Sequence, residues 1–141
     1  MIVTDHEKLE WDEWRPGVRS RAWATAANGA RQIRVAEQIL EPGNEAPMHW
    51  HYFEENITVI GGRGRFTVDG ETVELGPANT VIVPSMAVHG FESIGDEPLH
   101  IIAAMGWPIN EAYYVDDPFA VHRAGETLNS GQRRRLVPQG G

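Results

Sequence analysis

Cysteine is missing from this 141-residue sequence, and basic residues are scarce: 12 lysines and arginines stand against 20 aspartates and glutamates. Without cysteine the chain has no disulfide, no thiolate metal ligand and no cysteine nucleophile, and its redox compartment is left open. The formal net charge of −8 argues against nucleic acid and anionic membranes as partners, because both carry negative charge themselves.

Long hydrophobic runs are also missing. No apolar stretch approaches the roughly 20 residues that a transmembrane helix needs. The first five residues contain neither a basic nor an apolar signal region, so we expect no signal peptide and a cytoplasmic protein. Apolar residues make up 41% and charged residues 23% of the chain, which is typical of one globular domain with a buried core.

Positive charge is concentrated at the end of the chain. Residues 123–141 carry four arginines against one acidic residue, Glu126. A solvated tail is the simpler interpretation, because termini are usually poorly ordered unless something holds them. The alternative is a basic tail that folds back onto the acidic body or onto a second subunit.

Helical periodicity is weak, and short strands predominate from about residue 30 to residue 107. The predicted strands are 33–40, 56–60, 65–68, 71–75, 80–83, 88–93 and 99–105. Turn residues separate them, and Asp69-Gly70 is a strong hairpin signal. Strands at this spacing predict an all-β sandwich or barrel. Residues 108–122 have room for one short helical turn.

Two histidines, His49 and His51, are followed by a carboxylate at Glu55. Residues i and i+2 of a strand point to the same face, so both imidazoles can aim at one point. Two imidazoles and one carboxylate suit a divalent transition metal, and His89 is a candidate for a further ligand. An isolated pair of this kind is more often an ordinary surface or core pair, and Glu54 is the alternative ligand if the loop is shifted by one residue.

The spacing of these residues resembles the two motifs of the cupin superfamily, over about residues 33–107. The first motif fits at every position, through Gly43, His49, His51, Glu55 and Gly62. The second motif matches at Gly76, Pro84 and His89. Met86 replaces its usual glycine and Ser93 its usual asparagine. Neither replacement removes a metal ligand, but a turn that needs positive φ is costly for methionine.

The resemblance implies a double-stranded β-helix, a small jelly-roll barrel with one metal ion near its centre. The implied ligands are His49, His51, Glu55 and His89. Iron(II), manganese(II), nickel(II) and zinc(II) all suit this set, which does not choose among them. The implied organisation is an N-terminal arm and edge strand over 1–32, a barrel core over 33–107 and a C-terminal extension over 108–141.

Neighbouring residues are assigned by strand parity. Phe91 shares the parity of His89 and is expected to line the barrel interior, where a plain core position is the simpler interpretation. In the pocket that the resemblance implies, residues such as Ile57, Val59 and Phe91 are expected to form apolar walls around a substrate. The parity of His100 is open, and a second site there is not expected. Arg63 and Arg65 flank Gly64 after a turn, and a solvated hairpin there is a simpler interpretation than contact of one arginine with an anionic substrate.

Function is less determined than fold, because a barrel of this kind supports many chemistries. No Ser/His/Asp arrangement, P-loop or dinucleotide fingerprint is visible. We therefore expect a metal-dependent enzyme that acts on a small oxygen-chelating metabolite, of dioxygenase, isomerase, cyclase or lyase type. The alternative is a barrel that binds a sugar or metabolite without turnover. Trp11 and Trp14 predict a homodimer whose N-terminal arms cover the partner.

Overall fold

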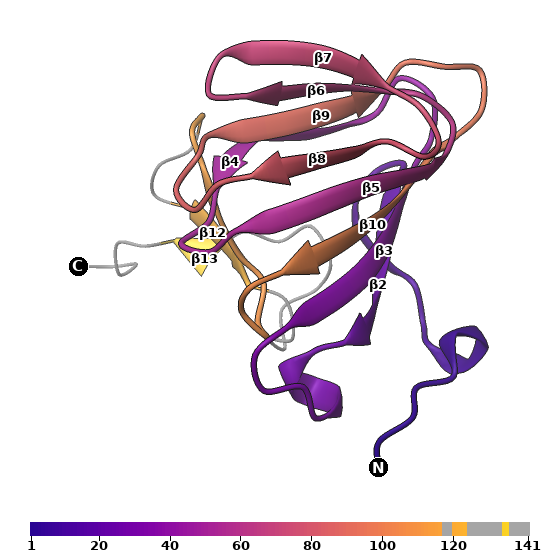
Figure 1. The fold of residues 1–141 in the computed structure, drawn as a ribbon, viewed down its shortest axis with the longest axis vertical. Coiled ribbons are helices and arrows are strands. Elements are labelled where there is room, and N and C mark those ends of the chain that lie inside the picture. Colours follow the sequence, from indigo (N-terminus) through magenta and orange to yellow (C-terminus); the bar gives the residue numbers. More distant parts are fainter. Residues whose placement is uncertain (117–119, 124–133, 136–141) are drawn as a thin grey trace.

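The computed structural model describes residues 1–116, 120–123 and 134–135, and its strands form two antiparallel sheets (Figure 1). The strands are β1 (Asp12–Arg15), β2 (Val18–Ala24), β3 (Arg34–Leu40), β4 (Glu45–Trp50), β5 (Glu55–Gly61), β6 (Gly64–Val68), β7 (Glu71–Leu75), β8 (Thr80–Val83), β9 (His89–Ser93), β10 (Leu99–Met105), β11 (Glu111–Tyr114), β12 (Ala120–Arg123) and β13 (Arg134–Arg135). Short 3-10 turns, η1 (His6–Lys8) and η2 (Ala26–Asn28), precede β1 and β3. No helix in this described part is long and apolar enough to cross a membrane.

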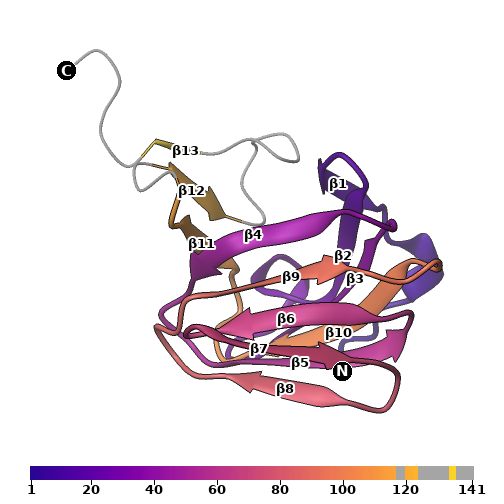
Figure 2. The ribbon, with the colours of Figure 1, turned by 90° about the horizontal axis from the view of Figure 1, so that it is seen from above.

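The two sheets have the mixed strand order of a jelly roll. One sheet runs β1-β2-β3-β10-β5-β8, and the other runs β13-β12-β11-β4-β9-β6-β7. Figure 2 shows the second order from β13 through β4 to β7. Since β10 lies between β3 and β5 although it follows both in the chain, the barrel is closed by contacts between distant segments.

The core lies between the sheets, as the alternating burial of the strands requires. β10 alternates buried and half-buried residues along its whole length, so one face is turned inward. The largest fully buried side chains include Phe66, Leu40, Ile57 and Leu99. Each side chain of this size stabilises the fold by about 1.5–3 kcal/mol through burial. The apolar core cluster contains only hydrophobic residues, so burial of these side chains stabilises the fold independently of the polar groups at the candidate site.

The predicted strands agree closely with the observed ones. Strands 71–75, 80–83 and 99–105 have the predicted bounds, and the other four differ by one residue at one or both ends. The helical turn suggested for residues 108–122 is wrong for the described part, since Glu111–Tyr114 is strand β11. It pairs with the free edge of β4, and such pairing overrides a weak local preference. The basic tail lies mostly outside the described residues.

The N-terminal arm packs on its own barrel. Trp14 in β1 donates a hydrogen bond from Nε1 to Gln38 Oε1 at 2.6 Å and packs against the apolar core. Trp11 lies against Arg21, whose guanidinium carbon is 4.3 Å from the ring centroid. The indole of Trp14 thus makes its contacts within its own chain, while the side chain of Trp11 remains 36% exposed.

The outer face of the six-stranded sheet holds a buried carboxylate, Glu37 on β3, which is only 4% exposed. It accepts hydrogen bonds from Arg21, from Trp23 Nε1 at 3.1 Å and from His100 Nε2 at 2.8 Å. Burial acts to raise the pKa of Glu37, but these hydrogen bonds outweigh it and hold the pKa below its usual value. His100 therefore points outward and belongs to this cluster.

The Glu37→Gln variant is expected to lose about 1–3 kcal/mol of unfolding free energy at pH 7, because hydrogen bonds to a charged acceptor are lost. Since the carboxyl pKa is lowered by folding, its contribution is fully present above the unfolded value of about 4.3 and is lost as the pH falls through the folded value. Urea unfolding of the wild type and of Glu37→Gln should show a difference in unfolding free energy that becomes smaller below about pH 4.

A matched control is Glu74→Gln, which removes an exposed carboxylate paired with Arg65 at 3.3 Å. Its effect should stay within about 0.5 kcal/mol, as for other exposed pairs. An equal loss of stability in the two variants would contradict the role given to Glu37.

Candidate metal centre

Four buried side chains converge between the two sheets: His49 near the end of β4, His51 just after it, Glu55 at the start of β5 and His89 at the start of β9. Their potential ligand atoms all lie within 4.8 Å of one another. Strand pairing explains this convergence, because His49 and His89 are direct partners across β4 and β9. His51 keeps the parity of His49, and Glu55 enters from the opposite sheet.

Backbone carbonyls fix the orientation of all three imidazoles. Nδ1 of His49 lies 2.6 Å from the carbonyl oxygen of Pro47, Nδ1 of His51 lies 2.7 Å from that of Glu111, and Nδ1 of His89 lies 2.9 Å from that of Ala87. A carbonyl only accepts, so each Nδ1 carries a proton and Nε2 is the nitrogen left to bind an ion. Nε2 of His89 donates to Glu55 and so also carries a proton, which a bound ion would displace. This arrangement is typical of histidines that bind metal through Nε2.

The electrostatics of the cluster favour a cation. Burial acts to raise the pKa of Glu55, but the neighbouring imidazoles of His51 and His89 outweigh it and hold the pKa far below its usual range. Burial, together with His89 and His51, holds the pKa of His49 well below its usual value, so this imidazole is neutral. Burial also acts to lower the pKa of His89, but the hydrogen bond from His89 Nε2 to Glu55 Oε1, 3.0 Å long, raises it.

One nitrogen of the cluster lacks a partner. Nε2 of His51 is buried without a hydrogen bond, and the nearest carboxylate oxygen, Oε1 of Glu55, is 3.6 Å away. A buried lone pair of this kind is costly unless something binds it. A divalent transition metal accepts imidazole nitrogens and a carboxylate oxygen together, so the residues present fit such an ion.

The structure brings together all four residues that the sequence indicated as ligands. Glu54, the alternative to Glu55, is exposed and lies outside the cluster. Met86 adopts φ 72°, so the turn keeps the backbone of the usual glycine. Its backbone N–H donates to the carbonyl oxygen of His51 at 2.8 Å, which ties this turn to the cluster.

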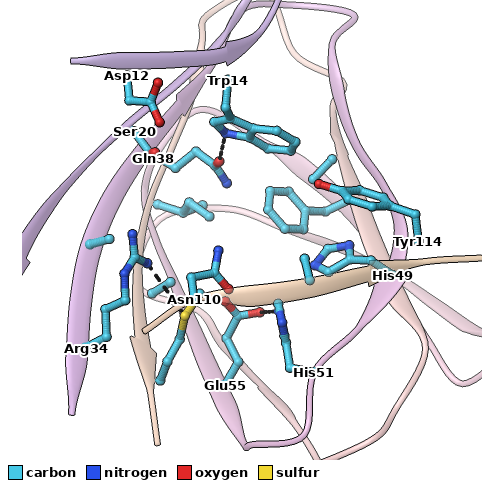
Figure 3. A pocket seen from close by; sticks show the side chains of 17 residues that line it. Asp12, Trp14, Ser20, Arg34, Gln38, His49, His51, Glu55, Asn110 and Tyr114 are labelled. Carbon is cyan, nitrogen blue, oxygen red and sulfur yellow. Dashed lines mark hydrogen bonds and ion pairs between the residues drawn. The ribbon is translucent and has the colours of Figure 1, made fainter. Parts of the chain in front are cut away.

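A pocket opens above the cluster (Figure 3). The centre of a water-sized sphere can occupy a volume of about 70 Å³ inside it. This space has room for a few water molecules or for one small molecule. The residues lining it are Asp12, Trp14, Ser20, Arg34, Ala36, Gln38, Ala46, His49, His51, Glu55, Phe91, Ile101, Ala103, Met105, Asn110, Ala112 and Tyr114.

The walls differ in part from the predicted ones. Phe91 lines the pocket as expected, whereas Ile57 and Val59 do not, and Ile101 on β10 lines it in their place. All four side chains belong to the apolar core. Sequence analysis also missed Arg34 and Gln38. Their signal was present, because both share the inward parity of Ala36 and Leu40 on β3, where a polar residue is unusual. Arg65, by contrast, is exposed and pairs with surface carboxylates, as the simpler interpretation held.

Comparison with known proteins agrees with this geometry. The family profile described as "Cupin domain" matches residues 36–105. Auxin-binding protein 1 of Arabidopsis thaliana is 25% identical over 134 residues, which cover 87% of this chain and 68% of that protein. Polyketide synthase CurC of Streptomyces cyaneus is 29% identical over 101 residues, which cover 71% of this chain and 66% of that protein.

Among solved structures, the polyketide cyclase RemF from Streptomyces resistomycificus superimposes with a TM-score of 0.68. The sequences are 18% identical, and the match covers 93% of this chain and 90% of that one. At this identity the likeness establishes the jelly-roll fold.

Proposed function

This chain belongs to the cupin superfamily, and on that premise we propose that it is a metal-dependent enzyme acting on a small oxygen-chelating molecule. The observation that carries the proposal is the set of three buried imidazoles held by backbone carbonyls with Nε2 beside Glu55, at the wall of a pocket. Such a set would hold iron(II), manganese(II), nickel(II) or zinc(II).

The protein residues and the ion would have separate tasks. Bound to His49, His51, Glu55 and His89, a divalent ion supplies Lewis acidity and open coordination positions for substrate oxygens. The chain itself would restrict substrate size through the small volume of the pocket, whose apolar lining includes Phe91 and Ile101. Gln38, whose carboxamide oxygen accepts from Trp14, offers a fixed polar group on the opposite wall.

Two relatives favour different finer assignments. CurC carries the name of a polyketide synthase, which supports the assignment as an enzyme. Auxin-binding protein 1 carries the name of a binding protein, which supports the alternative of a barrel that captures a small molecule without turnover. Each of the metal-dependent enzyme assignments, of dioxygenase, isomerase, cyclase or lyase type, would require an ion that the substrate can reach, so the accessible ion is the property that they share.

The test is a spectroscopic titration of the cobalt(II)-substituted protein. A chelating hydroxyketone, hydroxyacetone, is expected to change the cobalt absorption spectrum in the millimolar range, whereas acetone at equal concentration is not. Chelation requires two open positions, so the contrast reports on coordination rather than on pocket polarity. If no oxygen chelator changes the spectrum, the ion is coordinatively closed and the enzyme proposal fails.

We further propose a homodimer whose contact includes Trp11. A barrel of short antiparallel strands leaves edges such as β7 and β8 that need protection, and pairing across a two-fold axis is a common solution. The Trp11→Ala variant is expected to raise the dimer dissociation constant about tenfold, as for other aromatic anchors. Sedimentation velocity measures this change, and a wild-type monomer at micromolar concentration would contradict the proposal.

A further inference from the structure

The pocket contains a positive charge that the metal cluster does not use. Arg34, the first residue of β3, is only 6% exposed and lines the same pocket as His51 and Glu55. Figure 3 shows its guanidinium turned into the pocket, on the side where Asn110 and Glu55 lie. A buried arginine is rare in proteins unless a carboxylate or phosphate accompanies it.

Arg34 lacks such a companion. Within the described residues no carboxylate oxygen lies within 4.0 Å of its guanidinium, and its Nε is buried without a hydrogen bond. Its Nη1 lies 3.6 Å from the sulfur of Met105, which is a weak acceptor. Oδ1 of Asn110, on the same pocket wall, is also buried without a partner.

Three other arginines of the barrel pair directly with carboxylates. Arg19 lies 3.3 Å from a carboxylate oxygen of Glu41, Arg65 lies 2.6 Å from one of Glu92, and Arg21 pairs with Glu37. Burial lowers the pKa of Arg34, and attraction by Glu55 and Asp12 offsets this in part, so the guanidinium keeps its charge. The buried charge is therefore only partly compensated, because no carboxylate of the described residues pairs with it directly, and this points to a ligand that completes the pairing.

We propose that Arg34 binds a carboxylate of the substrate, so that the substrate is a small carboxylic acid with its chelating oxygens at the other end. This inference rests on the proposed function, because the chelating end requires the metal. The guanidinium forms two parallel hydrogen bonds to a carboxylate, a geometry that lysine does not offer. A single negative charge suits the site better than a phosphate, because Glu55 and Asp12 are close to it.

The test uses two 2-hydroxy dicarboxylic acids of different length, malate and 2-hydroxyglutarate. Each is compared with the analogue whose distal carboxylate is a carboxamide. Their dissociation constants are measured on the cobalt(II)-substituted protein by calorimetry and by the cobalt spectrum. We expect the wild-type protein to bind at least one acid ten or more times more tightly than its amide. In Arg34→Met this preference should fall below about twofold, with the affinity for the amide unchanged.

Arg65→Met is the control, since it also removes one positive charge but from the surface. It should keep the preference for the acid. An unchanged preference in Arg34→Met, or no preference in the wild type, would overturn the inference. Inorganic phosphate that competes as well as the distal carboxylate would overturn the assignment of a carboxylic acid.

The same measurements distinguish failure of the proposed function from failure of the role proposed for Arg34. If the acids bind with the Arg34-dependent preference but none of the compounds changes the cobalt spectrum, Arg34 binds an anion and the open metal position is wrong. If the amides change the spectrum but the acids have no advantage, the metal proposal stands and the role of Arg34 is wrong.

Thermal unfolding provides a second readout. Removing a buried charge that is only partly compensated should leave the melting temperature of Arg34→Met equal to or a few degrees above that of the wild type. Arg34→Lys keeps the charge and should not gain stability. A melting temperature that falls in Arg34→Met but not in Arg34→Lys would show that the charge has a structural partner, and would overturn the inference.

Discussion

The His49→Ala/His51→Ala double variant is expected to bind cobalt(II) or zinc(II) more than about a hundredfold more weakly than the wild type. Loss of outer-shell partners alone costs about 10–100-fold in metal affinity, and here two of the proposed direct ligands are removed. Metal analysis after purification should find little ion. The barrel should remain folded by circular dichroism, because its core is built from apolar residues such as Phe66 and Leu40.

Glu54→Ala is the matched control for this experiment, since Glu54 neighbours the proposed ligand Glu55 but is exposed. It should bind the ion as the wild type does. Full metal occupancy in the double variant would remove the ligand assignment. Loss of the ion in Glu54→Ala would instead shift the carboxylate ligand by one residue.

Gly62→Ala is expected to be the most damaging single glycine substitution, with a loss of about 2–4 kcal/mol. Gly62 has φ 72°, and a Cβ there would lie 2.3 Å from the carbonyl oxygen of Pro98 and 2.9 Å from Cα of Leu99. Both contacts are with backbone, so the chain itself would have to shift. The cost combines about 1 kcal/mol for a side chain at positive φ with about 1–3 kcal/mol for overpacking.

Gly70→Ala isolates the first of these two costs. Gly70 has a similar φ of 84°, but nothing lies within 4 Å of the position of a Cβ. Its loss in unfolding free energy should be about 1 kcal/mol, measured by urea unfolding beside Gly62→Ala. Equal losses would mean that backbone strain, rather than the close approach of the turn before β10, requires glycine at position 62.

The sequence by itself determined the strands whose signals are local. Residues 71–75, 80–83 and 99–105 have the predicted bounds, because alternation and turn residues act over a few positions. The convergence of His49 and His51 followed from strand parity, and that of Glu55 and His89 from motif spacing. Met86 was recognised as a costly replacement, and it does adopt the positive φ of the glycine it replaces.

Only the tertiary structure decided what depends on distant segments. Ile101 lines the pocket and Ile57 does not, because β10 lies between β3 and β5 in the sheet. Local periodicity cannot predict this strand order. His100 forms a hydrogen bond with Glu37, which lies 63 positions away in the sequence. The lack of a carboxylate beside Arg34 is a property of the packed barrel, since only folding brings some charged groups together and leaves others without a partner.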